Sequence, residues 1–311
     1  MSIIHKILRP RLPVTALSLS ASEATVVQLE RQKGTFGLRR AATVPLPAGL
    51  LRPDFTAHNI ANPVQLCDLL AELSESAGLG KQRKWSAALP EACAASHILT
   101  LEQKPASRAE LEEVLRWKTE RAFGTPVETL RTARELLPVS DNGRTRYLAV
   151  GIRLSVLAEY EEIFDALGWK MGFIVPRHIG EARWLANNGT AGDALLISST
   201  PDGFTALVQR NGQPFILRSV PCELADRDDE LYRLLLFYRD RAAPPEDATP
   251  LQKLLIIGDT AAREHLARIV NDTLDTNLQS LTPAQMGLNV PSPQIDFAAI
   301  AAPAGLATLA W

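Results

Sequence analysis

The sequence predicts a two-lobed α/β protein, and three observations support this. The chain has 311 residues, which suits two lobes of about 150 residues each better than one core. Apolar residues alternate between period 2 and period 3.6, so strands and helices are mixed throughout. A three-stranded meander followed by a helix occurs once in each half. This internal duplication predicts a cleft between the lobes, where ligands usually bind.

The first half opens with three predicted strands at residues 14–19, 24–29 and 38–44, separated by short polar turns that are typical of an antiparallel meander. A helix is then predicted to begin at Asn62, because Asn62 can cap it and Pro63 suits its first turn. Gly78 ends this helix, and residues 85–89 return as a strand.

From about residue 97 the pattern changes to a compact unit with its own strands and helices. A strand at 98–101 precedes Ser107-Arg108-Ala109-Glu110, a capping box that opens a helix. Paired strands are expected at 133–137 and 147–153, around a turn at residues 140–143. A helix ended by Gly168 follows. We interpret this stretch as a small α+β subdomain inserted into the first lobe.

The second half repeats the meander at residues 194–197, 204–210 and 214–220, with Asn211-Gly212 as a tight hairpin turn. A helix carrying Leu231 and Leu234 follows. After a Pro244-Pro245 linker come a strand at 254–257 and a helix. The expected divisions of the chain are 1–96 and 169–190 for the first lobe, 97–168 for the inserted subdomain, and 191–311 for the second lobe.

Composition excludes several classes of function. The formal net charge of −2 gives no field that would attract nucleic acid, and three well-separated cysteines suit a reducing compartment. No window approaches the roughly 20 apolar residues of a membrane span. Residues 1–8 are apolar and basic without a signal-peptide cleavage site. They favour a frayed arm over a weak contact with a membrane surface.

No motif for metal binding or nucleophilic catalysis stands out. The nucleophile elbow of hydrolases is absent, and the acidic residues 223–230 fit a helix start, where the helix dipole favours negative charge. The histidines lack the spacing of metal ligands and are expected to be ordinary surface or hydrogen-bonded residues; they are His5, His58, His97, His178 and His265.

Three segments carry a resemblance to a known family: residues 17–29 (LSLSASEATVVQL), 110–123 (ELEEVLRWKTERAF) and 157–176. The chain resembles the PilM-like proteins of type IV pilus assembly, relatives of FtsA in the actin-like ATPase superfamily. The resemblance covers almost the whole chain in element order. It implies an actin-like, ribonuclease H-like two-lobed fold with a small inserted α+β subdomain in the first lobe.

The expected nucleotide-binding motifs are degenerate. In the superfamily each of the two phosphate hairpins carries Asp-x-Gly, whereas this chain has Ser18 and Ser20 in the first hairpin. The adenosine turn normally has paired glycines. The remaining expected positions of the site are Ser198 and Thr200 in the second hairpin, and Gly258 followed by Asp259 in the adenosine turn.

These departures predict a protein without ATP turnover. Mg²⁺ needs charged oxygen ligands, and a serine hydroxyl cannot offset the phosphate charge. A side chain at a glycine position also adds a Cβ where backbone would meet phosphate. We therefore expect no catalytic residue, no bound metal and no cofactor, with ATP and Mg²⁺ possible but not favoured. The alternative is an active ATPase or sugar-kinase relative in which Asp202 or Asp259 supplies the missing carboxylate.

The resemblance also implies a partner. PilM-like proteins bind the cytoplasmic N-terminal tail of the inner-membrane protein PilN, so a scaffold that is cytoplasmic and peripheral to the inner membrane is expected, with a homo-oligomer left open. Trp117 and Phe123 are candidates for lining the peptide groove, although packing at the edge of the core also explains them. A GspL-like domain of type II secretion is another alternative, but such a chain would continue into a membrane span beyond Trp311.

Overall fold

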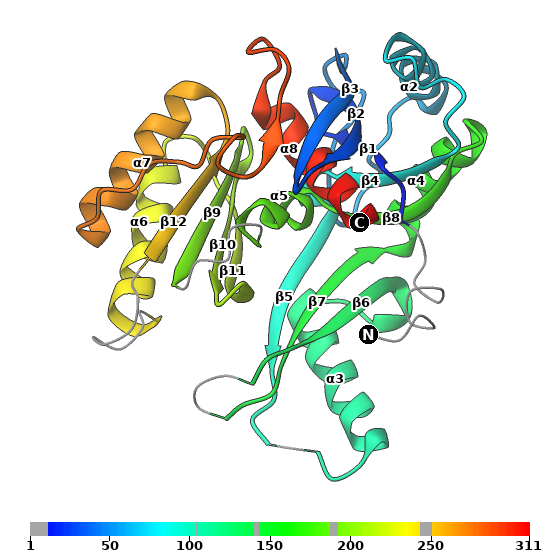
Figure 1. Ribbon diagram of the computed structural model, residues 1–311. Coiled ribbons are helices and arrows are strands. Elements are labelled where there is room, and N and C mark those ends of the chain that lie inside the picture. Colours follow the sequence, from blue (N-terminus) through cyan, green and yellow to red (C-terminus); the bar gives the residue numbers. More distant parts are fainter. Residues whose placement is uncertain (1–11, 104, 140–142, 187–191, 243–250) are drawn as a thin grey trace.

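The computed structural model describes residues 12–103, 105–139, 143–186, 192–242 and 251–311. The chain forms two lobes, each built on its own sheet, and a third, smaller sheet that projects from the first lobe (Figure 1). Helices α5 (Arg177–Ala186) and α8 (Phe297–Ala307) lie between the two large sheets. The predicted two-lobed α/β architecture with an inserted subdomain is confirmed.

The first lobe is built on a six-stranded sheet in the order β13-β3-β2-β1-β4-β8. Its first three strands form the predicted antiparallel meander, and β4 and β8 add to β1 in parallel. Helices α2 (Pro63–Ser76) and α4 (Leu154–Ala166) contribute to the core of this lobe. The strands are β1 (Thr15–Leu19), β2 (Glu23–Gln32), β3 (Thr35–Pro45), β4 (Lys84–Leu89), β8 (Lys170–Pro176) and β13 (Leu288–Asn289).

The second lobe is built on a four-stranded sheet in the order β11-β10-β9-β12. The predicted hairpin turn is confirmed: Asn211 and Gly212 both have positive φ angles, 52° and 74°, as a tight turn between twisted strands requires. Helices α6 (Arg227–Phe237) and α7 (Thr260–Leu274) pack on the sheet face that points away from α5. The strands are β9 (Asp193–Thr200), β10 (Gly203–Arg210), β11 (Gln213–Pro221) and β12 (Leu251–Ile257).

The inserted subdomain is a three-stranded sheet with one helix, α3 (Arg108–Phe123). Its strands are β5 (Ala94–Thr100), β6 (Leu130–Leu137) and β7 (Arg146–Arg153). Ser107 caps α3 by accepting a hydrogen bond from the Glu110 amide, while the Glu110 carboxylate accepts from the amide of Ala106 rather than Ser107. The turn expected at residues 140–143 lies, apart from Gly143, outside the described residues.

The structure differs from the expected divisions of the chain at two places. Helix α4 packs with α2 in the first-lobe core, because its apolar face, which includes Tyr160 and Phe164, is buried there. The inserted unit therefore ends with β7. The chain also leaves the second lobe before its end: β13 pairs with β3, and α8 packs against β1 and β2. The Pro244-Pro245 linker lies outside the described residues.

Helices α5 and α8 touch through their backbones. A Cβ built on Gly305 would lie 1.9 Å from the Gly180 carbonyl oxygen, and one built on Gly180 would lie 2.3 Å from the Ala302 carbonyl oxygen. The indole of Trp184 donates to the Ala301 carbonyl at 2.7 Å across the same contact. Only glycine permits so close an approach, so these two glycines set the separation of the helices between the lobes.

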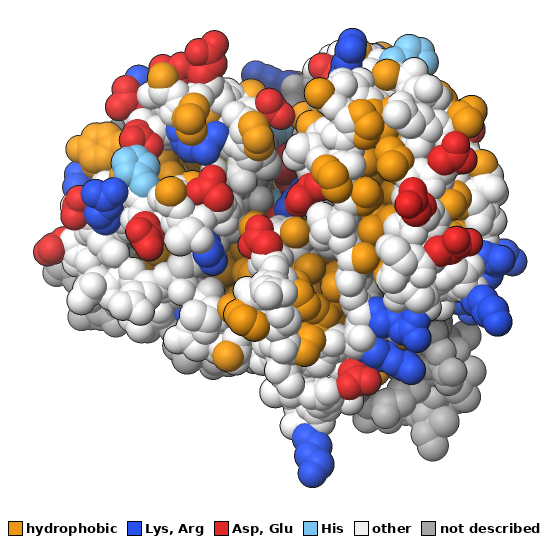
Figure 2. All heavy atoms as spheres, turned by 90° about the horizontal axis from the view of Figure 1, so that it is seen from above, with side chains coloured by type: hydrophobic (Ala, Val, Ile, Leu, Met, Phe, Trp, Pro, Cys, Tyr) orange, Lys and Arg blue, Asp and Glu red, His pale blue; other side chains and the backbone are white. Residues whose placement is uncertain are grey.

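Charges are mixed over the surface that Figure 2 shows. Acidic and basic side chains are interspersed over this face, with apolar side chains among them. This face therefore carries no field of a single sign, in agreement with the net charge. Among the described residues, no helix has the length and apolar character needed to cross a bilayer.

We predict that Gly305→Ala destabilises the protein by about 2–3 kcal/mol, because the new methyl group overlaps the Gly180 carbonyl oxygen and forces α5 and α8 apart. Thermal and denaturant unfolding measure the loss. Gly80→Ala is a matched control, since its Cβ would meet only the flexible Glu75 side chain at 3.1 Å. Equal stability of the two variants would show that the helix contact tolerates a side chain.

Candidate functional site

The two expected phosphate hairpins face the region between the lobes from opposite sheets. Ser18 is paired with Ala88 of β4, and Ser198 is paired with Thr205 and Ile257. Both serines are within strands and almost completely buried, with 2% and 1% of their surface exposed. The hydroxyl of Ser18 has no hydrogen-bond partner in the described structure. The positions expected to hold metal ligands are therefore inside the protein and uncharged.

The first hairpin turn is closed by its own serine. The Ser20 hydroxyl accepts hydrogen bonds from the amides of Ser22 and Glu23, at 3.3 and 3.0 Å, and lies 3.2 Å from the Glu23 carbonyl oxygen, to which it can donate. In a phosphate-binding turn, such amides would point to the ligand. Here the hydroxyl of Ser20, at the expected glycine position, accepts the hydrogen bonds of both amides.

The second hairpin turn carries a buried cation. Arg227 at the start of α6 donates to the Ser199 hydroxyl at 2.8 Å and to the Thr200 carbonyl at 2.5 Å. Only 6% of Arg227 is exposed, and within the described part of the chain no ion pair joins it to a carboxylate. The Thr200 hydroxyl donates to the Gly203 carbonyl at 3.4 Å. A fixed positive charge therefore lies at this hairpin.

The residues expected to form the adenosine turn cap the N-terminus of helix α7. Asp259 precedes α7 and accepts a hydrogen bond from the Ala262 amide at 2.8 Å, as N-cap residues do. Gly258 lies beside the second hairpin, since a Cβ built on it would be 3.4 Å from Ser199 Cβ. The Asp259 carboxylate thus has a local structural role.

A buried ion pair lies at the end of the first-lobe sheet, where β4 and β8 end side by side, and one hydrogen bond links it to the second lobe. Glu91, directly after β4, accepts from the His178 amide at 2.6 Å, and its other carboxylate oxygen lies 2.8 Å from His178 Nδ1. Thr205 of the second lobe donates to the same carboxylate at 3.3 Å. His178 is 1% exposed. The carboxylate of Glu91 therefore contacts the first lobe, the connecting helix α5 and the second lobe at once.

A second buried carboxylate, Glu181, lies one turn further along α5. Arg177 donates to it at 3.4 Å and also to the Ala298 carbonyl of α8 at 3.1 Å. Glu181 is completely buried, and one of its oxygens has no partner in the described structure. Burial, the largest cause, raises the pKa of Glu181, although Arg177 and a hydrogen bond from Ser198 oppose the shift. The serine at the expected metal position thus faces this carboxyl group.

The electrostatics of the ion pair favour its charged form. Burial alone would raise the pKa of Glu91, but the charge of His178 and its hydrogen bonds hold that pKa below its ordinary value. Burial would likewise lower the pKa of His178, and the adjacent Glu91 raises it instead. Of the two buried acidic groups, Glu91 is thus held in its charged form by His178, whereas burial favours the uncharged form of Glu181. No group of three or more possible ligands could hold a metal ion within the described ranges.

The two predicted groove residues are not brought together. Phe123 is 8% exposed and packs in the core of the inserted subdomain, against Phe55 and His97. Trp117 is 54% exposed on α3, with the guanidinium of Arg121 at 5.4 Å from its ring centroid. Only Trp117 could contact a partner directly, so the groove stays a prediction that now depends on this residue.

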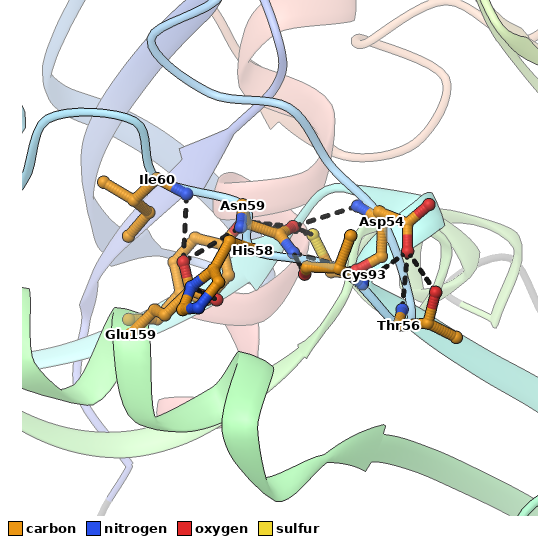
Figure 3. Close-up of polar contacts among 9 residues, drawn as sticks. Asp54, Thr56, His58, Asn59, Ile60, Cys93 and Glu159 are labelled. Atoms are coloured by element: carbon orange, nitrogen blue, oxygen red, sulfur yellow. Dashed lines mark hydrogen bonds and ion pairs between the residues drawn. The ribbon is translucent and has the colours of Figure 1, made fainter.

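A polar cluster anchors the loop that carries Phe55 (Figure 3). The Asn59 side chain accepts from the Cys93 thiol at 3.0 Å and from the Tyr160 hydroxyl at 3.2 Å. The Glu159 carboxylate of α4 accepts from the amides of Asn59 and Ile60. Burial raises the pKa of Cys93 to about 12, so its thiol remains a neutral donor. The cluster fixes the loop between the first lobe and the inserted subdomain.

The sequence analysis names the residues of both hairpins but does not name the ion pair of Glu91 with His178. His178 fits the expectation of a surface or hydrogen-bonded histidine, but its partner Glu91 was not singled out, because 87 positions separate the two residues in the sequence. One signal was available: Glu91 is a carboxylate two residues after the strand predicted at 85–89.

No family model matches the chain, and no curated protein sequence matches it. Solved structures show that it has the actin-like ATPase fold. A chain of the PilM-PilN type IV pilus biogenesis complex superposes with a TM-score of 0.78 and 19% identity, covering 97% of this chain and 99% of that chain. A Bacteroides thetaiotaomicron protein with an actin-like ATPase fold and unknown function superposes with a TM-score of 0.53 and 13% identity, covering 93% and 96%.

We predict that the protein loses stability as the pH rises from 6 to 8. His178 has an ordinary pKa of 6.5, and its folded pKa is higher, so its contribution is complete below 6.5 and is lost as the pH rises through the folded pKa. The pKa of Glu181 is also raised in the folded protein. Because the unfolded chain ionises Glu181 more readily, a rise in pH favours unfolding at this residue as well. Thermal unfolding at both pH values measures the effect.

In this experiment His178→Gln should unfold at a lower temperature than the wild type at pH 6 and show a smaller difference between the two pH values. His265→Gln, which removes an exposed histidine 2.7 Å from Asp228, serves as control and should keep the wild-type pH dependence. A His178→Gln profile parallel to the wild type would contradict the assignment.

Proposed function

We propose that the protein is a cytoplasmic scaffold of a type IV pilus or related secretion platform, which binds the N-terminal tail of a PilN-like inner-membrane protein without turning over ATP. The likeness to a chain of the PilM-PilN complex over nearly the full length of both chains supports the scaffold. The partner tail would keep the protein at the inner membrane.

The single observation that supports the absence of turnover is that the buried carboxylate of Glu91 is paired with a cation of the chain itself. Glu91 is paired with His178 and hydrogen-bonded to Thr205, so it is not free to hold Mg²⁺. The amides of the first hairpin turn are occupied by Ser20. The interlobe contacts that a metal–nucleotide complex would provide are made here by side chains of the chain itself.

The alternative, an active ATPase or sugar-kinase relative, requires that Asp202 or Asp259 supply the carboxylate for the metal. Asp259 caps α7, and Asp202 lies exposed in the turn after β9, so neither is poised beside Ser18 and Ser198. No specific observation favours this rival, and a GspL-like role uses the same fold. A nucleotide-binding measurement separates scaffold from enzyme.

We predict that ATP with Mg²⁺ binds no more tightly than about 1 mM in isothermal titration calorimetry, because the two strand positions that would offer carboxylates to the metal carry hydroxyl groups. A titration without Mg²⁺ is the control. Micromolar binding that requires Mg²⁺ would refute the proposal and favour the enzyme.

We predict that a synthetic tail of the membrane protein encoded beside this one binds the purified chain, and that Trp117→Ala weakens binding at least about tenfold, since an exposed tryptophan in a groove is a typical hot spot. Trp311→Ala is a matched control: Trp311 is 45% exposed and packs on Phe36, in the first lobe. Absence of tail binding, or equal effects of both variants, would contradict the groove.

A further inference from the structure

The outer strand of the inserted subdomain, β6, is an open edge strand. The sheet of this subdomain runs in the order β5-β7-β6. Its opposite edge strand, β5, contacts β11 of the second lobe, so β6 lies on the side away from that lobe (Figure 1). Within the described part of the chain, only β7 pairs with β6. Every second residue of an antiparallel strand directs its N–H and C=O away from its partner, so this edge offers hydrogen-bonding groups to another strand.

The edge of β6 lacks the features that usually prevent pairing with another chain, which include proline, lysine, a bulge or a very short strand. The edge strand β11 contains Pro214, and the register of its pair with β10 shifts between Val208 and Gln209. The edge strand β13 has only two residues. In contrast, β6 has the sequence LRTARELL and pairs with β7 in unbroken register over eight residues. Its residues 133–136 are all exposed.

Two exposed charges on β6, those of Arg131 and Glu135, have no ionic partner among the residues that the structure describes. The neighbouring Arg134 differs, because it is paired with Glu112 of α3 at 2.8 Å. Arg131 and Glu135 are four positions apart, so they share one face of the strand but are separated by about 13 Å along it. Residues directly opposite each other on neighbouring strands have their Cβ atoms only about 5 Å apart. A strand added to this edge could therefore supply both missing counter-charges.

A second copy of β6 is such a strand. When two copies run antiparallel about a two-fold axis, with Ala133 opposite its own counterpart, each Arg131 lies opposite a Glu135. Centring the pair on Arg134 would instead place two guanidinium groups opposite each other, which destabilises a sheet. Centring it on Thr132 would leave Arg131 opposite Ala133, without a counter-charge. The charges of β6 are thus self-complementary in one two-fold register.

We propose that the protein forms a two-fold homodimer in which the β6 strands of two copies pair antiparallel, centred on Ala133. The two three-stranded sheets then form one continuous sheet. The second copy also covers Leu136, which is 61% exposed, because this register places it opposite Leu130. Main-chain hydrogen bonds supply the affinity, and the paired charges select the register. A single strand pair buries little surface, so we expect a dissociation constant in the micromolar range.

This dimer goes beyond the proposed function and does not depend on it. The proposed function concerns a partner's tail and the exposed Trp117 of α3, whereas the dimer uses the free edge of β6 and needs no other protein. Measurements on the purified chain alone therefore test the dimer, and either proposal can fail without the other.

The first experiment is sedimentation equilibrium of the full chain over a range of concentrations, where we expect a monomer–dimer equilibrium. Arg131→Glu should weaken the dimer at least about tenfold, because it places carboxylates opposite each other at two places in the interface. Arg131→Glu/Glu135→Arg should restore the dimer, since the exchanged charges again lie opposite each other. Arg39→Glu is the matched control, because Arg39 is an exposed arginine of another strand, β3. Circular dichroism checks that each variant is folded.

The second experiment tests the register by a disulfide. The Cα atoms of directly opposite residues are about 4.5–5.5 Å apart, which a disulfide can bridge, so Ala133→Cys should link two chains on mild oxidation. Thr132→Cys is the matched control, because its two copies would be about 8 Å apart and out of reach. The wild type controls for disulfides of Cys67 and Cys222, which are partly exposed.

A chain that stays monomeric at the highest concentration would overturn the proposal. A dimer that withstands Arg131→Glu, or that Arg39→Glu weakens equally, would overturn it as well, because another surface or the net charge would then explain association. Linkage through Thr132→Cys but not through Ala133→Cys would exclude the proposed register. A monomeric chain in which Arg131→Glu instead abolishes binding of the partner's tail would assign this edge to the tail.

Discussion

The close contact of α5 with α8 is the constraint on which the arrangement of the two lobes depends. Gly180 and Gly305 bring the two helix backbones together, and both helices pack between the sheets of the two lobes in one continuous apolar cluster. Because α5 also carries His178 and Glu181, the same contact positions the buried charges between the hairpins. The packing of α5 on α8 therefore also determines where the buried charges of α5 lie.

Charged side chains of the chain itself lie beside the two expected phosphate hairpins. The chain supplies its own carboxylate in Glu91 and its own cations in His178, Arg177 and Arg227. A buried ion pair gains little over well-packed apolar side chains, but breaking it by removing one partner is costly. Loss of either Glu91 or His178 alone would therefore leave its partner buried without a counter-charge.

Much of the fold could be predicted from the sequence, because both meanders and most helices have one apolar face and clear end signals such as Asn62 and Gly168. Helix α8 could not be predicted in this way. Its sequence FAAIAAPAGLA is apolar on all sides, so it shows no period, and Pro303 inside it argues against a helix. Nor does its sequence indicate that the chain returns to the first lobe.

The candidate site was predictable only in part, for a different reason. Ser18 and Ser198 could be placed because the hairpin turns fix the register of their strands. The pairing of Glu91 with His178 depends on the parallel pairing of β4 with β8, which places Leu89 opposite Pro176 and which no local pattern encodes. For Phe123 the sequence leaves core packing and a groove open, because helical spacing alone does not show that Phe55, from a distant loop, packs against it.

The polar cluster around Asn59 has a mechanical consequence. Asn59 is hydrogen-bonded at once to its own loop, to Cys93 at the root of β5 and to Tyr160 of α4, and the same loop presses Phe55 onto the inserted subdomain. The inserted subdomain is therefore held to the first lobe by this loop as well as by its two chain connections.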